Sequence, residues 1–254
     1  MYRFYHCCSF PKIPFLIFRL TTRHLPPGKK RFFLEDAAAS PCTCPTSGAL
    51  YRDLKRSLEW HDQNEPFFKS AQKVLGEFAY KMYMDNFTDR RQTLFLGGEP
   101  GSGKSSLLNI FLNVTPKHRV FSPVYESGFP FSAIKPWHLI GNYQEFRLMP
   151  KWSPSTTLLM LERAENVQLD VKNEGSTSVP RGPRNIMTSN HLTPKGPWSP
   201  EDVVAILDRV VPMRWDLKRP AMVSECNVLE ARCRRCSVEI MRFCSPEMAR
   251  DLVI

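Results

Sequence analysis

The sequence predicts an α/β domain in which helices flank a parallel sheet, and two observations carry this prediction. The first is a short apolar run, residues 92–96, which a glycine-rich turn joins to an apolar stretch of helical length, residues 105–114. A strand, a glycine loop and a helix in this order form the opening unit of a parallel α/β domain. The second is a series of later strand candidates, separated by loops and a helical stretch.

Hydrophobic periodicity places the other elements. Residues 50–87 carry apolar side chains at three-to-four spacing with few breakers, which predicts amphipathic helices. The later strand candidates are residues 138–140, 167–171 and 184–188, and the helical stretch is residues 155–165. Residues 224–254 mix charges with cysteines and suggest a small helical or zinc-stabilised tail. We therefore expect a poorly ordered leader over residues 1–48, a helical segment over 49–90, the α/β domain over 91–220 and a Cys-containing tail over 221–254.

Composition limits the class of protein. The chain has 254 residues, of which 42% are hydrophobic, and this fits one compact domain with an appendage. It contains no run of eighteen uncharged apolar residues, so we expect a soluble, intracellular protein without a membrane partner. The net charge of +10 is concentrated in residues 1–34, which hold seven Lys or Arg and no acid. This leader could bind nucleic acid or an anionic surface, act as a targeting segment, or be an unfolded tail.

Residues 98–105 match the phosphate-loop pattern G-x-x-x-x-G-K-[ST] in full. Glycines allow backbone N–H groups to point at phosphates, and the following helix presents its positive end to the anion. Lys104 would reach the β- and γ-phosphates of ATP, and the Ser105 hydroxyl would ligate Mg²⁺. The expected nucleotide-binding residues are Gly98, Glu99, Pro100, Gly101, Ser102, Gly103, Lys104, Ser105 and Ser106.

A second, acidic element should lie at the end of a strand beside this loop. Glu145 is the nearest suitable acid, and it would help to hold Mg²⁺ and activate water. The position before it, where an aspartate is usual, is Gln144. A neutral amide adds no charge for holding the metal. Glu145 could alternatively be a solvated surface acid.

Two later stretches complete a family pattern. Residues 158–172 form a leucine-rich run that ends in Val-Lys, and residues 182–190 end in Thr188-Ser189-Asn190. With the phosphate loop and the acidic strand end, this order resembles the superfamily 3 helicases. The likeness is strongest to the replication-initiator (Rep) helicase domain of circular single-stranded DNA viruses, and it covers residues 65–215. It implies a P-loop NTPase with an AAA+-like parallel sheet flanked by helices and preceded by a small helical segment.

The resemblance also implies residue roles. Asn190 matches the polar sensor that positions the attacking water, and Lys172 matches the lysine of a hairpin that grips the nucleic-acid backbone. Arg209, or secondly Arg214, matches the arginine that reaches the nucleotide of a neighbouring subunit. The plain alternatives are a turn residue for Asn190, a solvated lysine for Lys172 and a surface salt bridge for Arg209. The helices before the loop could form the collar of a ring or be ordinary core helices.

The pattern of the viral initiators is not met at the N-terminus. Their nicking domain carries two metal-binding histidines, whereas the six histidines here form no H-x-H and only about 90 residues precede the loop. We therefore expect no nicking domain.

The eight cysteines form two groups near the ends, with none between Cys44 and Cys226. This clustering fits reduced thiols or a terminal metal site better than a disulfide scaffold. The C-terminal group includes one C-x-x-C pair, whose spacing suits tetrahedral zinc. The candidate zinc ligands are Cys226, Cys233, Cys236 and Cys244. Unliganded thiols and disulfides remain the alternatives.

The leading hypothesis is an ATP-dependent helicase or translocase of viral replication type, which acts on single-stranded DNA or RNA as a ring, expected to be a hexamer. The competing hypothesis is a non-hydrolysing relic that binds ATP and nucleic acid, because Gln144 replaces an acid. A P-loop kinase or GTPase is disfavoured, since the sequence has neither an N-K-x-D motif nor an arginine-rich lid. Location in the host nucleus or the cytoplasm stays open.

Overall fold

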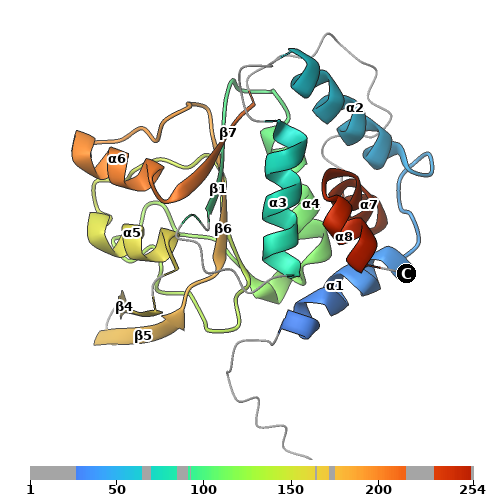
Figure 1. Ribbon diagram of the computed structural model, residues 1–254. Coiled ribbons are helices and arrows are strands. Elements are labelled where there is room, and N and C mark those ends of the chain that lie inside the picture. Colours follow the sequence, from blue (N-terminus) through green and yellow to red (C-terminus); the bar gives the residue numbers. More distant parts are fainter. Residues whose placement is uncertain are drawn as a thin grey trace, which may run out of the picture.

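The computed structural model describes residues 27–64, 70–84, 91, 93–163, 165–171, 175–215 and 232–252. Helices lie on both sides of a central sheet of five strands, in the order β2-β3-β6-β1-β7 (Figure 1). These strands are β1 (Thr93–Gly97), β2 (Val120–Phe121), β3 (Ile140–Tyr143), β6 (Arg184–Ser189) and β7 (Val210–Arg214). Every pairing between them is parallel, which confirms the predicted fold class.

The two middle strands β1 and β6 are buried throughout because both faces of the sheet are covered. Side chains alternate along a strand, so Leu94 and Leu96 belong to one hydrophobic core and Phe95 to another. The sheet therefore separates two cores.

One face carries most of the helices. They are α1 (Pro27–Ala39), α2 (Ala49–Asn64), α3 (Ala71–Tyr83), α4 (Lys104–Val114), α7 (Arg234–Cys244) and α8 (Pro246–Asp251). Figure 1 shows α3, α4, α7 and α8 together on this side of the sheet. Helix α7 contacts α1, α2, α3, α4 and α8, so it is the centre of the layer. We call this face the helical face.

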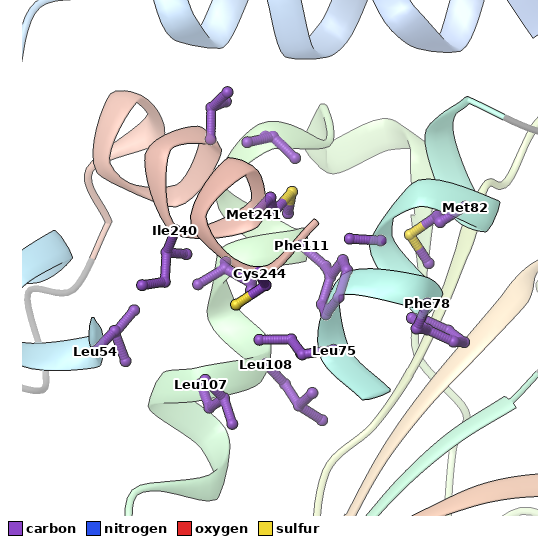
Figure 2. Close-up of a cluster of buried hydrophobic side chains, with 14 of the residues drawn as sticks. Leu54, Leu75, Phe78, Met82, Leu107, Leu108, Phe111, Ile240, Met241 and Cys244 are labelled. Atoms are coloured by element: carbon purple, nitrogen blue, oxygen red, sulfur yellow. The ribbon is translucent and has the colours of Figure 1, made fainter. Parts of the chain in front are cut away.

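The core of the helical face is close-packed where α3, α4 and α7 meet (Figure 2). The rings of Phe78 and Phe111 meet edge to face with their centroids 5.6 Å apart. Gly76 of α3 lies against the backbone of Cys244, and a Cβ at that position would clash with the Cys244 carbonyl group. Only glycine allows this approach of α3 to the end of α7.

The opposite face, which we call the loop face, carries shorter elements. They are α5 (Pro154–Leu161), α6 (Pro200–Leu207) and the antiparallel hairpin of β4 (Glu165–Val171) and β5 (Gly175–Arg181). A one-turn 3-10 helix, Lys117–Arg119, precedes β2. The core of the loop face contains a cluster of aromatic side chains, in which Trp152 lies against Tyr125, Phe131 and Phe146. Long loops connect these elements over the sheet.

Three helices begin in the same way. Each of α5, α6 and α8 follows a serine whose hydroxyl accepts a hydrogen bond from the third residue along, and each has proline as its first residue. The serine satisfies a backbone N–H that the helix cannot, and proline lacks one to satisfy. These local signals set the helix starts at Pro154, Pro200 and Pro246.

The structure departs from the expected organisation at both ends of the chain. Residues 27–39, expected in a poorly ordered leader, form α1, which buries Leu34 and Ala37 against the helical face. Its sequence has little amphipathic pattern. We therefore attribute the stability of α1 to its contact with α7 rather than to hydrophobic periodicity. The tail is helical as expected, but α7 shares one core with α2 and α3. Among the described residues, no helix is both long and apolar enough to cross a membrane.

Candidate functional site

The loop after β1 has the geometry of an anion cradle. Gly103 is the N-cap of α4 with φ of 89°, and Gly101 has φ of 77°, a left-handed conformation that suits glycine. A Cβ at either glycine would meet no atom within 4 Å, so the space in front of the loop is open. The positive end of α4 faces this space. Backbone N–H groups and the positive end of a helix together favour a negatively charged group at such a place.

Lys104 lies inside the loop. It is the first residue of α4 and is buried, and its Nζ donates to the carbonyls of Gly98 at 2.8 Å and Glu99 at 2.6 Å. A third contact, at 3.4 Å, goes to Ser102 Oγ. These are neutral acceptors that a charged phosphate oxygen can replace. The ammonium group therefore stands where the loop would hold an anion.

A network of polar side chains joins the loop to the ends of two neighbouring strands. Ser105 Oγ donates to Gln144 Oε1 at 2.9 Å, and Thr188 Oγ1 donates to the same oxygen at 3.3 Å. Gln144 Nε2 donates to Asn142 Oδ1 at 3.0 Å. Both the oxygen and the nitrogen of the Gln144 amide thus form hydrogen bonds. The oxygens gathered here belong to hydroxyl and amide groups, and no member of this network is charged.

Glu145 and Asn190 follow strands β3 and β6 at the same edge of the sheet. Because parallel strands end at a common edge, these residues lie on the side of the sheet that carries the loop, the side at which ligands bind in open α/β sheets. Glu145 has φ of 50°, which is unusual for a residue with a side chain, and its N–H donates to Thr188 Oγ1 at 3.0 Å. Both side chains are exposed. The structure therefore brings the predicted acid and sensor to the loop's edge of the sheet.

Trp215 contacts the phosphate loop through a hydrogen bond to its backbone. Its indole Nε1–H donates to the carbonyl of Ser102 at 2.9 Å, and its ring stacks on His61 with centroids 4.7 Å apart and planes 11° apart. His61 Nε2 lies 2.8 Å from the carbonyl oxygen of Arg214. Helix α2 therefore contacts the loop through two aromatic rings, and sequence reasoning named neither of them.

The two arginine candidates have different surroundings. Arg209 Nε donates to Glu162 Oε2 at 2.9 Å, and Arg209 Nη1 donates to the Ala205 carbonyl at 2.7 Å. Arg209 therefore forms an intramolecular salt bridge, which is mostly buried and not the surface pair of the alternative interpretation. Arg214 is the last residue of β7 and pairs in register with Gly97, the residue before the loop. Their proposed action on a neighbouring subunit stays a prediction.

Lys172 lies outside the described residues. The strands on either side of it, β4 and β5, form an antiparallel hairpin in which Val171 pairs with Gly175. A hairpin at this position agrees with what the family resemblance implies. The role of Lys172 stays a prediction.

The predicted zinc ligands do not form one group. Cys226 lies outside the described residues, and Cys244 is not among the cysteines whose sulfurs gather. Cys233 and Cys236 do gather, but with Cys42 and Cys44 of the expected leader. Two members of the predicted set are thus replaced by two cysteines about 190 residues away in the sequence.

The chain matches no protein-family model and no curated protein. It is similar in structure to the JC virus (JCV) helicase, crystallised with a small-molecule acetamide, with a TM-score of 0.42 and 12% identity over 76% of this chain and 61% of that one. It is also similar to the C-terminal region of NrS-1 in an apo form, with a TM-score of 0.37 and 14% identity over 83% of this chain and 53% of that one. The chain thus spans less than two thirds of either neighbour.

Proposed function

We propose that the protein binds ATP with Mg²⁺ at residues 98–106 and hydrolyses it. The observation that carries this proposal is the position of Lys104, held inside an open glycine loop at the N-terminus of α4. Lys104 would exchange the loop carbonyls for the β- and γ-phosphates, and Ser105 would turn its hydroxyl toward the metal. The neighbouring oxygens of Gln144 and Asn142 would accept hydrogen bonds from metal-bound water.

Glu145 and Asn190 would act on the attacking water. Glu145 would take its proton as a general base while Asn190 orients it by hydrogen bonds. Mg²⁺ would stabilise charge that develops on the phosphate oxygens. Both side chains are exposed at the carboxyl edge of the sheet, which supports these roles.

In this proposal ATP turnover drives movement along single-stranded DNA or RNA by a ring of subunits. The family resemblance supports this finer function, with Lys172 on the β4–β5 hairpin contacting the nucleic-acid backbone. Arg209 would have to leave Glu162 to reach a neighbour's nucleotide, whereas Arg214 ends the strand beside the loop. Hydrolysis would then depend on assembly.

A second candidate function is ATP binding without hydrolysis. Gln144 favours it, since this neutral amide accepts the hydrogen bond of Ser105, the predicted metal ligand. A carboxylate in that place would attract Mg²⁺, and the amide attracts it less. Such a protein would bind ATP tightly, and the bound ATP would support assembly rather than movement along nucleic acid.

ATP turnover by the full chain separates the two candidates. We expect turnover that rises with single-stranded DNA or RNA and disappears in Lys104→Ala, while Lys117→Ala, an exposed lysine after α4, leaves it unchanged. The informative variant is Gln144→Glu, which adds a carboxylate without changing the length of the side chain. If wild type binds ATP without turnover and Gln144→Glu hydrolyses it, the second candidate is correct. If no variant binds ATP, both fail.

A further inference from the structure

Four cysteine sulfurs meet at one point of the helical face. The Sγ atoms of Cys42, Cys44, Cys233 and Cys236 all lie within 4.8 Å of one another. Cys236 Sγ lies 3.5 Å from Cys44 Sγ and 3.7 Å from Cys42 Sγ, and Cys233 Sγ lies 3.6 Å from Cys42 Sγ. We call these residues the cysteine quartet. Each belongs to a short pair, C-x-C or C-x-x-C.

These distances fit four ligands of one metal ion. Zn–S bonds of about 2.3 Å at tetrahedral angles place the sulfurs about 3.8 Å apart. A disulfide requires about 2.05 Å between its sulfurs, and all four cysteines are free thiols. A tetrahedral set of four sulfurs selects zinc or iron among biological metals. We propose that the cysteine quartet binds one zinc ion, which joins the α1–α2 loop to the start of helix α7.

Backbone N–H groups donate hydrogen bonds to two sulfurs of the cysteine quartet. The N–H of Gly48 donates to Cys42 Sγ at 3.3 Å, and the N–H of Cys236 donates to Cys233 Sγ at 3.5 Å. Cys233 is also the N-cap of α7, so the positive end of this helix lies beside the sulfurs. Donors of this kind orient and stabilise metal-bound thiolates.

The pKa values of three cysteines of the quartet are shifted in opposite directions by their surroundings. The hydrogen bond from Gly48 is the largest influence that lowers the pKa of Cys42, to about 6. Burial raises the pKa of Cys44 to about 11 and also raises that of Cys236. A bound divalent cation would allow all four sulfurs to be thiolates.

The proposed ion would connect segments from opposite ends of the chain. Cys42 and Cys44 lie between α1 and α2, and Cys233 and Cys236 begin α7, which contacts α1, α2, α3 and α4. An ion pair between Arg234 and Asp36, with N···O of 2.6 Å, links the same two segments. The phosphate loop leads into α4, and α4 contacts α7. The zinc would therefore stabilise the layer of helices that supports the candidate nucleotide site.

Metal content of the full chain tests this proposal. We expect about one zinc per chain by elemental analysis of protein purified under reducing conditions without chelator. Cys44→Ser and Cys236→Ser should lose the zinc, whereas Cys244→Ser, a buried cysteine of the same helix outside the quartet, should keep it. Cys226→Ser should keep it too. Wild type without zinc, or with iron in its place, would overturn the proposal, as would zinc lost from Cys244→Ser and kept in Cys44→Ser.

A second measurement covers the case in which a variant that loses zinc also unfolds. Zinc is removed from the wild-type full chain with a chelator under reducing conditions, and cobalt(II) is then titrated in. We expect the visible bands of a tetrahedral cobalt–thiolate site, saturating at about one equivalent. A cobalt spectrum without thiolate charge-transfer bands would contradict the quartet.

Discussion

The two faces of the sheet are built in different ways. On the helical face, α1 and α7 come from opposite ends of the chain and meet in one core, and four cysteines gather at their junction. On the loop face, short elements close in sequence surround an aromatic core. The candidate site lies at the carboxyl edge of the sheet, between the two faces. Lys104 begins α4 of the helical face, and Gln144 follows β3, ahead of α5 of the loop face. A layer of packed helices that carries the phosphate loop thus meets a face of short elements and loops at the candidate site.

The largest loss of stability is expected from a substitution at Gly76 of the helical face. Replacing Gly76 by Ala places a methyl group against the backbone of Cys244, which cannot move without separating α3 from α7. We expect a loss of about 3 kcal/mol in the free energy of unfolding, measured by urea denaturation. Gly128→Ala is the matched control, since a Cβ there meets nothing within 4 Å. Equal stability of the two variants would contradict the close approach of α3 and α7.

On the loop face, the ion pair of Glu162 with Arg209 separates a structural role from a catalytic one. Both side chains are mostly buried, at 18% and 14% exposure, so Glu162→Gln should cost about 1–2 kcal/mol of stability. Glu126→Gln, an exposed glutamate, should change nothing. If Arg209 acts on a neighbouring subunit, Arg209→Ala abolishes ATP turnover while Glu162→Gln retains it. Equal loss of turnover in both variants would show that Arg209 acts only through the ion pair.

Asp62 gives the helical face a dependence on pH. Burial alone would raise its pKa, but the neighbouring His61 imidazole and hydrogen bonds from Ser70 and the N–H groups of Ala71 and Gln72 lower it below the ordinary value of 3.8. The ionised carboxylate therefore stabilises the fold above that value, and the stabilisation is lost as pH falls through the lowered pKa of the folded protein. Asp62→Asn should cost about 1 kcal/mol at pH 7. Denaturation at several pH values checks this, since a difference that does not shrink in acid would contradict it.

The smallest expected effect is at Tyr143, in the core of the loop face. Its hydroxyl is buried without a hydrogen-bond partner within the described part of the chain. Removing the hydroxyl leaves no partner unsatisfied, so Tyr143→Phe should change stability by less than about 1 kcal/mol and in the stabilising direction. Thermal denaturation measures this difference. A clear loss of stability would reveal a partner for the hydroxyl, such as an ordered water.

The elements around the phosphate loop could be predicted because their signals are local. Glycines, a lysine and an apolar run placed β1 and α4 to within about one residue. β7 was not predicted, and Pro212 explains this, since proline argues against a strand. β7 is the last strand in the order of the sheet, and an edge position tolerates proline. Local patterns therefore located the loop but not the whole sheet.

The cysteine quartet could not be predicted from spacing, because its two pairs lie about 190 residues apart in sequence. The C-x-x-C pair indicates a metal site, and the cysteines nearest to it in the sequence are Cys226 and Cys244. Cys42 and Cys44 lie between α1 and α2, and the contacts of both helices with α7 bring these cysteines to the C-x-x-C pair. The contact of α1 with α7 also explains why α1 forms from a sequence with little periodicity. Tertiary contacts decided both features.

The most direct test of the central claim is calorimetric titration of the full chain with ATP and Mg²⁺. We predict saturable binding at one site per chain in wild type and in Lys117→Ala, and a loss of affinity of at least about 100-fold in Lys104→Ala. That result would place the nucleotide at the loop of residues 98–106. Binding of equal strength in wild type and Lys104→Ala, or no binding by wild type, would contradict it.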